Sequence, residues 1–149
     1  MKTKIDIGLD KFLSGYNCAQ AVLYSFCDEL HFDRDTALKL ACGFGGGMGR
    51  RQEVCGAISG GIIAIGLRYG HGEGQDKTVN EETYRKVREL MAGFESKHGS
   101  CCCRALLNGC DPTTPDGKQY FKENDLRNKT CKVCVETVVR IVDGFLLNP

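Results

Sequence analysis

The segment Cys55 to Leu67 reads CGAISGGIIAIGL and is apolar on every side when it is wound as a helix. A helix that is hydrophobic all round has to be buried among other elements, and glycines within it let neighbouring backbones approach closely. A strand over residues 62–65 is the weaker interpretation. The segment is also too short and too rich in glycine to span a membrane. It therefore predicts a buried, glycine-rich central helix.

The rest of the chain shows helical patterns with suitable N-cap residues. Apolar residues recur at helical spacing over residues 5–13, 18–30, 33–44, 80–97 and 131–147. Short helices are also predicted over residues 102–107 and, opened by Pro115, over residues 115–121. Side chains that commonly cap helices precede several of these segments: Asn17, Asp33 or Asp35, Asn80, Ser100, and Asn128 or Thr130. A chain of 149 residues is most simply one domain. We predict a single all-α domain over residues 1–149, a bundle of six to seven helices around the central helix.

Net charge and the N-terminal sequence argue against several classes of function. Lys and Arg number 20 and Asp and Glu 19, so the formal net charge is +1. This balance gives no electrostatic case for binding nucleic acid. The chain runs from Met1 into acidic residues without the apolar core of a signal peptide. We expect a cytoplasmic protein that neither binds nucleic acid nor inserts into a membrane.

Ten cysteines are the unusual part of the composition. In a reducing compartment, clustered cysteines are more often metal ligands or catalytic thiols than structural disulfides. Four of them stand where a helix is predicted to begin: Cys18, Cys55, Cys103 and Cys131. The partial positive charge of a helix N-terminus lowers the pKa of a thiol and favours the reactive, metal-binding thiolate. These positions predict redox or metal chemistry.

Cys55 is the strongest single candidate, because it follows a glycine-rich loop over residues 43–51 and opens the central helix. That loop fits neither of the standard phosphate-binding glycine patterns, so we interpret it as a tight backbone crossing beside Cys55. Arg50 and Arg51 either add positive potential there or are solvated loop charges. The three histidines, His31, His71 and His98, lie at predicted helix ends or in loops, where exposure is the simpler interpretation.

The other cysteines are assigned by their patterns. Cys131 and Cys134 form a CxxC pair, the spacing of a dithiol redox motif, but Cys134 also lies on the apolar stripe of the last helix and is predicted to pack in the core. Cys27 and Cys42 are predicted to be core residues, and Cys110 a surface residue. Adjacent residues at the start of a helix point about 100° apart, so only one of Cys101, Cys102 and Cys103 is expected to face a site.

Several segments together resemble the redox-active protein family named for its C_GCAxxG_C_C cysteine pattern, over nearly the whole chain. The matching segments are Gly15-Tyr16-Asn17-Cys18-Ala19-Gln20-Ala21-Val22, Phe44-Gly45-Gly46-Gly47-Met48-Gly49, Cys55-Gly56-Ala57-Ile58-Ser59-Gly60-Gly61, Cys103-Arg104-Ala105-Leu106-Leu107, and Cys131 with Val135. The resemblance implies that Cys18, Cys55, Cys103 and Cys131 are the four defining cysteines. It also implies that Cys134 occupies an ordinarily apolar position. A similar domain in some multihaem cytochromes that also hold an iron–sulfur centre favours a cluster by analogy.

Three functions stay open at this point. The first is electron transfer or redox sensing by an iron–sulfur cluster bound to Cys18, Cys55, Cys103 and Cys131. The second is thiol–disulfide exchange with Cys55 as the catalytic, attacking thiol. The third is a structural zinc site, held by the same four cysteines, in an interaction module. An unidentified redox protein is the expected partner, a homodimer stays open, and Cys101, Cys102 and Cys110 have no assigned role.

Overall fold

The computed structural model describes residues 1–147, over which the chain folds as an all-α bundle, as predicted. Within these residues there are nine α-helices: α1 (Lys4–Leu13), α2 (Cys18–Ser25), α3 (Cys27–Leu30), α4 (Arg34–Cys42), α5 (Gly56–Tyr69), α6 (Asn80–His98), α7 (Cys103–Leu106), α8 (Pro115–Glu123) and α9 (Lys132–Leu147). A 3₁₀ turn, Lys77–Val79, precedes α6, and a π-helical turn, Arg127–Cys131, precedes α9. The count exceeds the predicted six or seven, partly because α3 and α7 are single turns and the segment 18–30 divides at Phe26.

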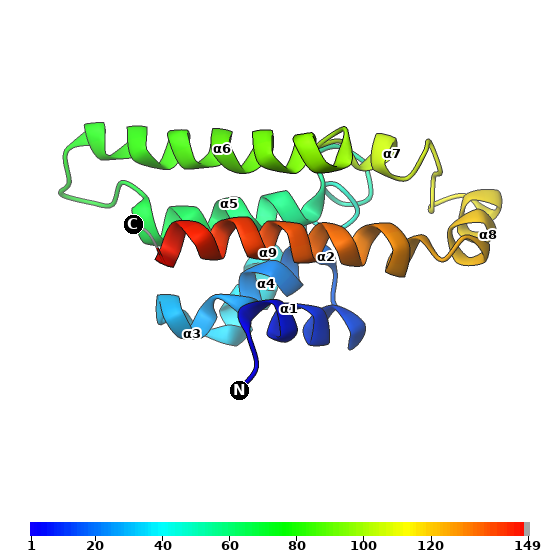
Figure 1. The fold of residues 1–149 in the computed structure, drawn as a ribbon, viewed down its shortest axis with the longest axis horizontal. Coiled ribbons are helices and arrows are strands. Elements are labelled where there is room, and N and C mark those ends of the chain that lie inside the picture. The colour runs from blue at the N-terminus through cyan, green and yellow to red at the C-terminus, as the bar shows by residue number, and fades with distance from the viewer. Residues whose placement is uncertain (148–149) are drawn as a thin grey trace.

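Helix α5 is the central element of the bundle. It contacts α2, α3, α6 and α9. In Figure 1, α6 runs along the top, α5 and α9 lie beneath it, and α1 to α4 form the lower part. Helices α7 and α8 stand together at one end. Within residues 1–147, no helix combines the length and apolar character that a membrane crossing requires.

The glycines of α5 determine how closely its neighbours pack, as the sequence predicted. A Cβ at Gly60 would lie 2.5 Å from the backbone oxygen of Ala19 in α2. A Cβ at Gly61 would lie 2.6 Å from a methyl group of Val138 in α9. Backbone therefore packs against backbone where α5 crosses α2. The helix is continuous to Tyr69, so the alternative of a strand over residues 62–65 is wrong.

Two of the predicted caps begin helices as expected. The Asn17 side chain accepts a hydrogen bond from the backbone N–H of Gln20, whose own side chain accepts one from the N–H of Asn17. The Asp33 side chain accepts a hydrogen bond from the backbone N–H of Thr36 at the start of α4, without a reciprocal bond. The prediction for Asn80 is wrong: Asn80 is the first residue of α6, and Asp76 caps the 3₁₀ turn before it. An acidic cap and a short turn thus start this helix earlier than the pattern suggested.

The predicted start of the last helix is also wrong. Cys131 is the last residue of the π-helical turn, which runs without a break into α9. Neither Asn128 nor Thr130 caps α9, because both lie inside that turn. Cys131 is therefore an interior helical residue. Of the four cysteines, Cys18, Cys55 and Cys103 begin helices and Cys131 does not.

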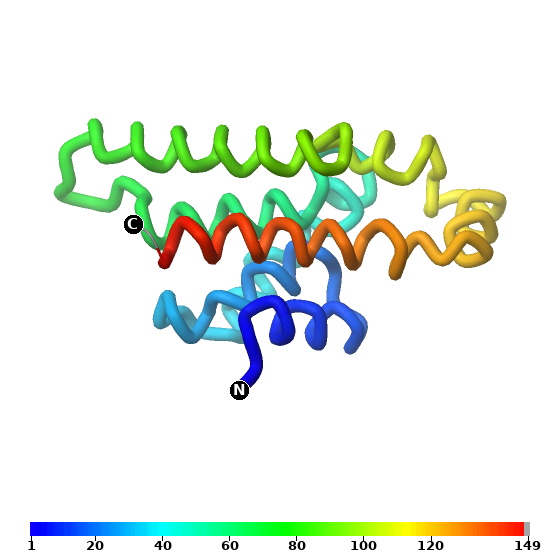
Figure 2. Tube along the Cα trace, in the orientation of Figure 1, coloured from blue at the N-terminus to red at the C-terminus, as the bar shows by residue number. Residues whose placement is uncertain are grey.

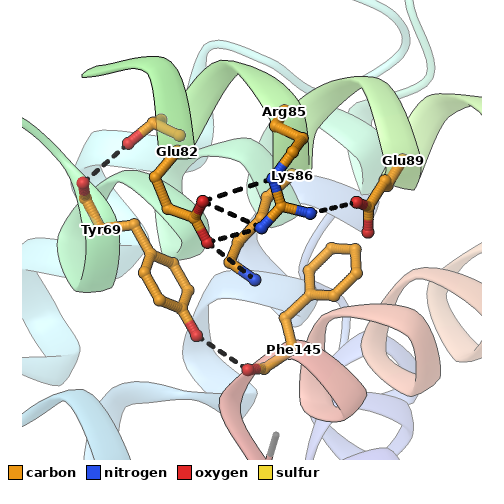
Figure 3. Close-up of polar contacts among 7 residues, drawn as sticks. Tyr69, Glu82, Arg85, Lys86, Glu89 and Phe145 are labelled. Carbon is orange, nitrogen blue, oxygen red and sulfur yellow. Dashed lines mark hydrogen bonds and ion pairs between the residues drawn. The ribbon is translucent and has the colours of Figure 1, made fainter. Parts of the chain in front are cut away.

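The opposite end of the bundle is joined by a buried lysine and two aromatic rings (Figure 3). The Lys86 ammonium of α6 lies 4.5 Å from the ring centroid of Tyr69 and 5.0 Å from that of Phe145. It also pairs with Glu82 at 3.4 Å. The Tyr69 hydroxyl donates a hydrogen bond of 2.7 Å to the backbone oxygen of Phe145. These contacts join the end of α5 and the start of α6 to the end of α9.

Candidate functional site: a cavity lined by five cysteines

A cavity of about 480 Å³ opens at the end of the bundle that carries α7 and α8. Five cysteines line it, and we call it the cysteine cavity: Cys18, Cys55, Cys103, Cys131 and Cys134. All four cysteines predicted as site residues therefore lie around one cavity, although they are far apart in the sequence. Cys134, which was predicted to serve only the core, lies there too.

Glycines bring Cys18 and Cys55 together at the starts of α2 and α5. A Cβ at Gly56 would lie 2.9 Å from the backbone oxygen of Phe44 and 3.6 Å from the Cβ of Cys18. One turn later, Gly60 meets the backbone of α2. Two glycines spaced four residues apart on one face of α5 thus let the two helix starts approach. This explains physically why glycines surround Cys55 in the sequence.

Backbone pairing places Cys103 beside Cys55. Val54 and Cys102 form an isolated antiparallel bridge. The Cys55 N–H donates to the oxygen of Cys101 at 2.8 Å, and the Cys103 N–H donates to the oxygen of Glu53 at 2.7 Å. Figure 2 shows the segment before α5 running up beside the chain between α6 and α7. Two short extended segments therefore hold the starts of α5 and α7 together.

The same pairing separates the three adjacent cysteines. Because successive residues of an extended segment point to opposite sides, Cys102 faces away from its two neighbours. The Cys102 thiol donates to the oxygen of Gln52 at 3.3 Å, and the Cys101 thiol donates to the oxygen of Met91 at 3.5 Å. Of the three, Cys103 lines the cavity. The expected 100° spacing does not hold, because only Cys103 is helical.

The glycine-rich loop forms one wall of the cavity. Residues 46–50 all have φ between 59° and 69°, a left-handed region that costs a residue other than glycine about 1 kcal/mol or more. Met48 and Arg50 adopt it without being glycine. A Cβ at Gly47 would lie 2.8 Å from the Cβ of Cys103. The loop is thus the close backbone crossing predicted from the sequence, and it passes beside Cys103 as well as before Cys55.

Two of the thiols, Cys55 and Cys134, share a hydrogen bond. This bond is the main reason why the pKa of Cys55 is lowered, and the backbone N–H groups of Ala57 and Ile58 at the start of α5 lower it further. The same bond, followed by burial, raises the pKa of Cys134. Cys134 therefore keeps its proton and donates it to the Cys55 sulfur. The CxxC spacing was the sequence signal for Cys134, but it pointed to Cys131 as its partner.

Cys18 and Cys131 form a second thiol pair. Their hydrogen bond raises the pKa of Cys18, with burial as the next cause. It lowers the pKa of Cys131, and the nearby Arg127 also favours the Cys131 thiolate. Burial raises the pKa of Cys103 to about 12, and Cys55 and Cys131 add to that rise. The expectation that helix starts lower the pKa of all four thiols is therefore wrong for Cys18 and Cys103, where burial and neighbouring sulfurs outweigh the helix start.

Basic side chains surround the thiols. Arg50, Lys118 and Arg127 line the cavity, and no lining residue in the described part of the chain is acidic. The Arg127 guanidinium is held in place: it lies 4.0 Å from the centroid of the Phe12 ring and donates to the backbone oxygen of Phe12 at 2.5 Å. Arg51 instead faces Glu53 at 3.9 Å on the surface. The cavity therefore favours negative charge on its sulfurs or on a molecule bound beside them.

The cysteines outside the cavity match the sequence predictions only in part. Cys27 is buried, as predicted. Cys42 is exposed, so its assignment to the core is wrong; α4 ends at this residue, with Gly43 following as its C-cap. Cys110 is buried rather than on the surface, and its thiol donates to the oxygen of Gly117 at 3.2 Å.

None of the three histidines lines the cavity. His31 ends α3 in a left-handed conformation. His71 bonds to the backbone oxygen of Gln75 at 2.8 Å, and the His98 ring lies 2.9 Å from the Thr137 hydroxyl. His31 and His71 are exposed, as expected, whereas His98 is partly buried. The site is therefore built from thiols.

A metal ion in a protein needs several donor side chains around one point. Over residues 1–147, no group of three or more His, Cys, Asp or Glu side chains is arranged so that it could hold a metal ion. Five thiols nonetheless line one cavity, together with basic side chains. Cysteine thiolates are the usual ligands of iron–sulfur clusters, in which the ligands bind several irons instead of a single ion. The donor chemistry fits a cluster better than it fits a single ion.

Comparison with known proteins identifies the family. A family model described as "Putative redox-active protein (C_GCAxxG_C_C)" matches residues 16–145. No curated protein matches the chain, and no solved structure matches it. The matched range begins just before Cys18 and ends within α9, so it includes the five cysteines of the cavity. The chain belongs to the C_GCAxxG_C_C family of redox-active proteins.

Proposed function

We propose that the chain is a cytoplasmic redox protein that binds an iron–sulfur cluster in the cysteine cavity and exchanges electrons with a partner protein. Cys18, Cys55, Cys103 and Cys131 would be the ligands. When bound, the cluster would supply one-electron redox chemistry. The observation that carries the proposal is the convergence of these four thiols, from four separate parts of the chain, on one cavity.

The charge of the cavity supports this proposal. A cluster with four thiolate ligands carries net negative charge, and its potential depends on that charge and on hydrogen bonds to the sulfurs. Arg50, Lys118 and Arg127 line the cavity, and none of the described residues that line it is acidic. The N–H groups of Ala57 and Ile58 favour the thiolate of Cys55. These groups would stabilise the reduced, more negative state.

Thiol–disulfide exchange is the second candidate. The lowered pKa of Cys55 favours the thiolate, which is the form that attacks a disulfide. Its contact with a second thiol supplies a group that can resolve a mixed disulfide. The zinc alternative has less support, because a structural zinc ion needs four donors around one point and the described residues contain no such group of three or more.

Single replacements of the four proposed ligands test the assignment. Cys18→Ser, Cys55→Ser, Cys103→Ser and Cys131→Ser should each lower the iron content of protein purified without oxygen. Cys42→Ser, at an exposed position, and Cys27→Ser, at a buried position away from the cavity, are the controls. Equal loss of iron in all six variants would reject the ligand assignment. A metal-free wild type whose Cys55 is rapidly alkylated would favour thiol–disulfide exchange instead.

A further inference from the structure

We propose that Cys55 and Cys134 are an oxidation site, at which a small anionic disulfide converts the two thiols of the metal-free protein into a disulfide. The bond would withdraw Cys55 from metal binding. This last consequence rests on the proposed function, because it requires Cys55 to be a ligand. The oxidation itself does not depend on it.

The contact between the two thiols is the first step of the argument. Cys55 is the N-cap of α5, Cys134 lies in the first turn of α9, and the two sulfurs share a hydrogen bond. Both side chains are buried in the same core, with exposed fractions of 6% and 1%. Two thiols that share a hydrogen bond and line one cavity can form a disulfide once their sulfurs approach to about 2.05 Å.

The sequence alone would pair Cys134 differently. CxxC spacing suggests a disulfide between Cys131 and Cys134. In the structure, however, the hydrogen-bond partner of Cys131 is Cys18, the first residue of α2. Cys134 is instead the partner of Cys55. Oxidation is therefore expected to link α5 to α9 and not to close the CxxC pair.

The chemistry balances with a disulfide as the oxidant. The Cys55 thiolate attacks one sulfur of the small disulfide, and the other sulfur leaves as a thiolate. Cys134 then attacks the Cys55 sulfur of the mixed disulfide, which releases the second small thiolate. The proton of Cys134 passes to a released thiolate. Two protein thiols are thereby oxidised to one disulfide, and the small disulfide is reduced to two thiols.

The lining of the cavity determines which disulfides react best. Both thiols line the cysteine cavity, so a small reagent can reach them although they are buried in the core. Arg50, Lys118 and Arg127 line the same cavity without an acidic side chain among the described lining residues. This arrangement attracts carboxylates and repels ammonium groups. The matched reagents are therefore dithiodiglycolate, which is anionic, and cystamine, which is cationic and of similar size.

The first experiment maps the disulfide in metal-free wild type. The protein is treated with dithiodiglycolate, its free thiols are alkylated, and its peptides are analysed by mass spectrometry. We expect a Cys55–Cys134 linkage, formed on the order of tenfold faster than with cystamine at low salt, and a smaller difference at high salt. A Cys131–Cys134 linkage would overturn the pairing. Equal or faster reaction with cystamine would overturn the preference for anions.

The second experiment tests the consequence for metal binding. Wild type treated with dithiodiglycolate should take up much less iron than untreated wild type, and a thiol reductant should restore uptake. In Cys134→Ala and Cys134→Ser the reaction should stop at the mixed disulfide on Cys55, so these variants should keep one half of the reagent, seen in the mass of the intact protein, whereas wild type and Cys27→Ala, a matched buried control, should keep none. Cys134 variants that keep no reagent, or wild type that keeps it on Cys55, would overturn the proposal. If reduced wild type takes up no iron, the proposed cluster fails, and the disulfide map still decides the oxidation site.

Discussion

Replacing Gly60 by alanine should separate α2 from α5 and destabilise the protein. The added Cβ would lie 2.5 Å from the oxygen of Ala19 and 3.1 Å from its Cα, about 0.9 Å inside the 3.4 Å at which ordinary contact with that oxygen begins. These atoms belong to a helix backbone and cannot rotate away. Overpacking of this kind costs about 1–3 kcal/mol. The higher helix propensity of alanine offsets about 0.5–1 kcal/mol of that cost. Because the atoms that the new Cβ meets are backbone, the upper part of the overpacking range applies, about 2–3 kcal/mol, and after about 1 kcal/mol of helix propensity Gly60→Ala should lower the free energy of unfolding by about 1–2 kcal/mol.

Gly66 provides the matched control on the same helix. A Cβ there meets no atom within 4 Å, so Gly66→Ala should raise the free energy of unfolding by about 0.5–1 kcal/mol. Urea denaturation of both variants measures the difference, and thermal melting should show Gly60→Ala lower than wild type by roughly 3–6 °C. Because Gly60 lies one turn from Gly56, this variant should also take up less iron than Gly66→Ala. Equal or greater stability of Gly60→Ala than of wild type would refute the close crossing of α2 and α5.

Three further predictions concern caps, charge and pH. Asn17→Ala removes the acceptor for the Gln20 N–H at the start of α2 and should cost about 1 kcal/mol in urea denaturation; an unchanged midpoint would contradict a role for the cap. Lys86→Met keeps the apolar stem but loses the contacts with two aromatic rings and Glu82, and should cost about 1 kcal/mol; a variant as stable as wild type would show that these contacts contribute nothing. Burial lowers the pKa of His98 below its ordinary 6.5. The unfolded chain therefore binds more protons in this range, so stability should fall as pH drops below about 6.5, and His98→Gln, compared at pH 7.5 and 5.5, should show a smaller fall.

Local patterns predicted the helices well because their causes are local. An apolar segment with glycines predicted the central helix, and Asn17 predicted the cap that places Cys18 at the start of α2. The prediction that Asn80 caps a helix failed because Asp76, four residues earlier, already starts a turn. The prediction that Cys131 begins the last helix failed because a π-helical turn precedes α9 and contains Cys131. No side chain near Cys131 signals such a turn.

The cavity could be predicted only in part, because contacts between distant residues leave no local signal. Cys103 lines it since residues 52–55 pair with residues 101–104, a backbone arrangement that no spacing reveals. Cys134 was assigned to the core because it lies on the apolar stripe of α9, and it is indeed 1% exposed. The same burial places its thiol against Cys55. A core position and a site position coincide here, and periodicity cannot separate them.

Iron and acid-labile sulfide in the wild-type protein, purified without oxygen, test the central claim most directly. The proposed cluster predicts a coloured protein that contains iron and sulfide in equal molar amounts, both lost together in Cys55→Ser and both retained in Cys42→Ser. A colourless wild type without iron or sulfide, even after reconstitution of the reduced protein with iron and sulfide, would contradict it.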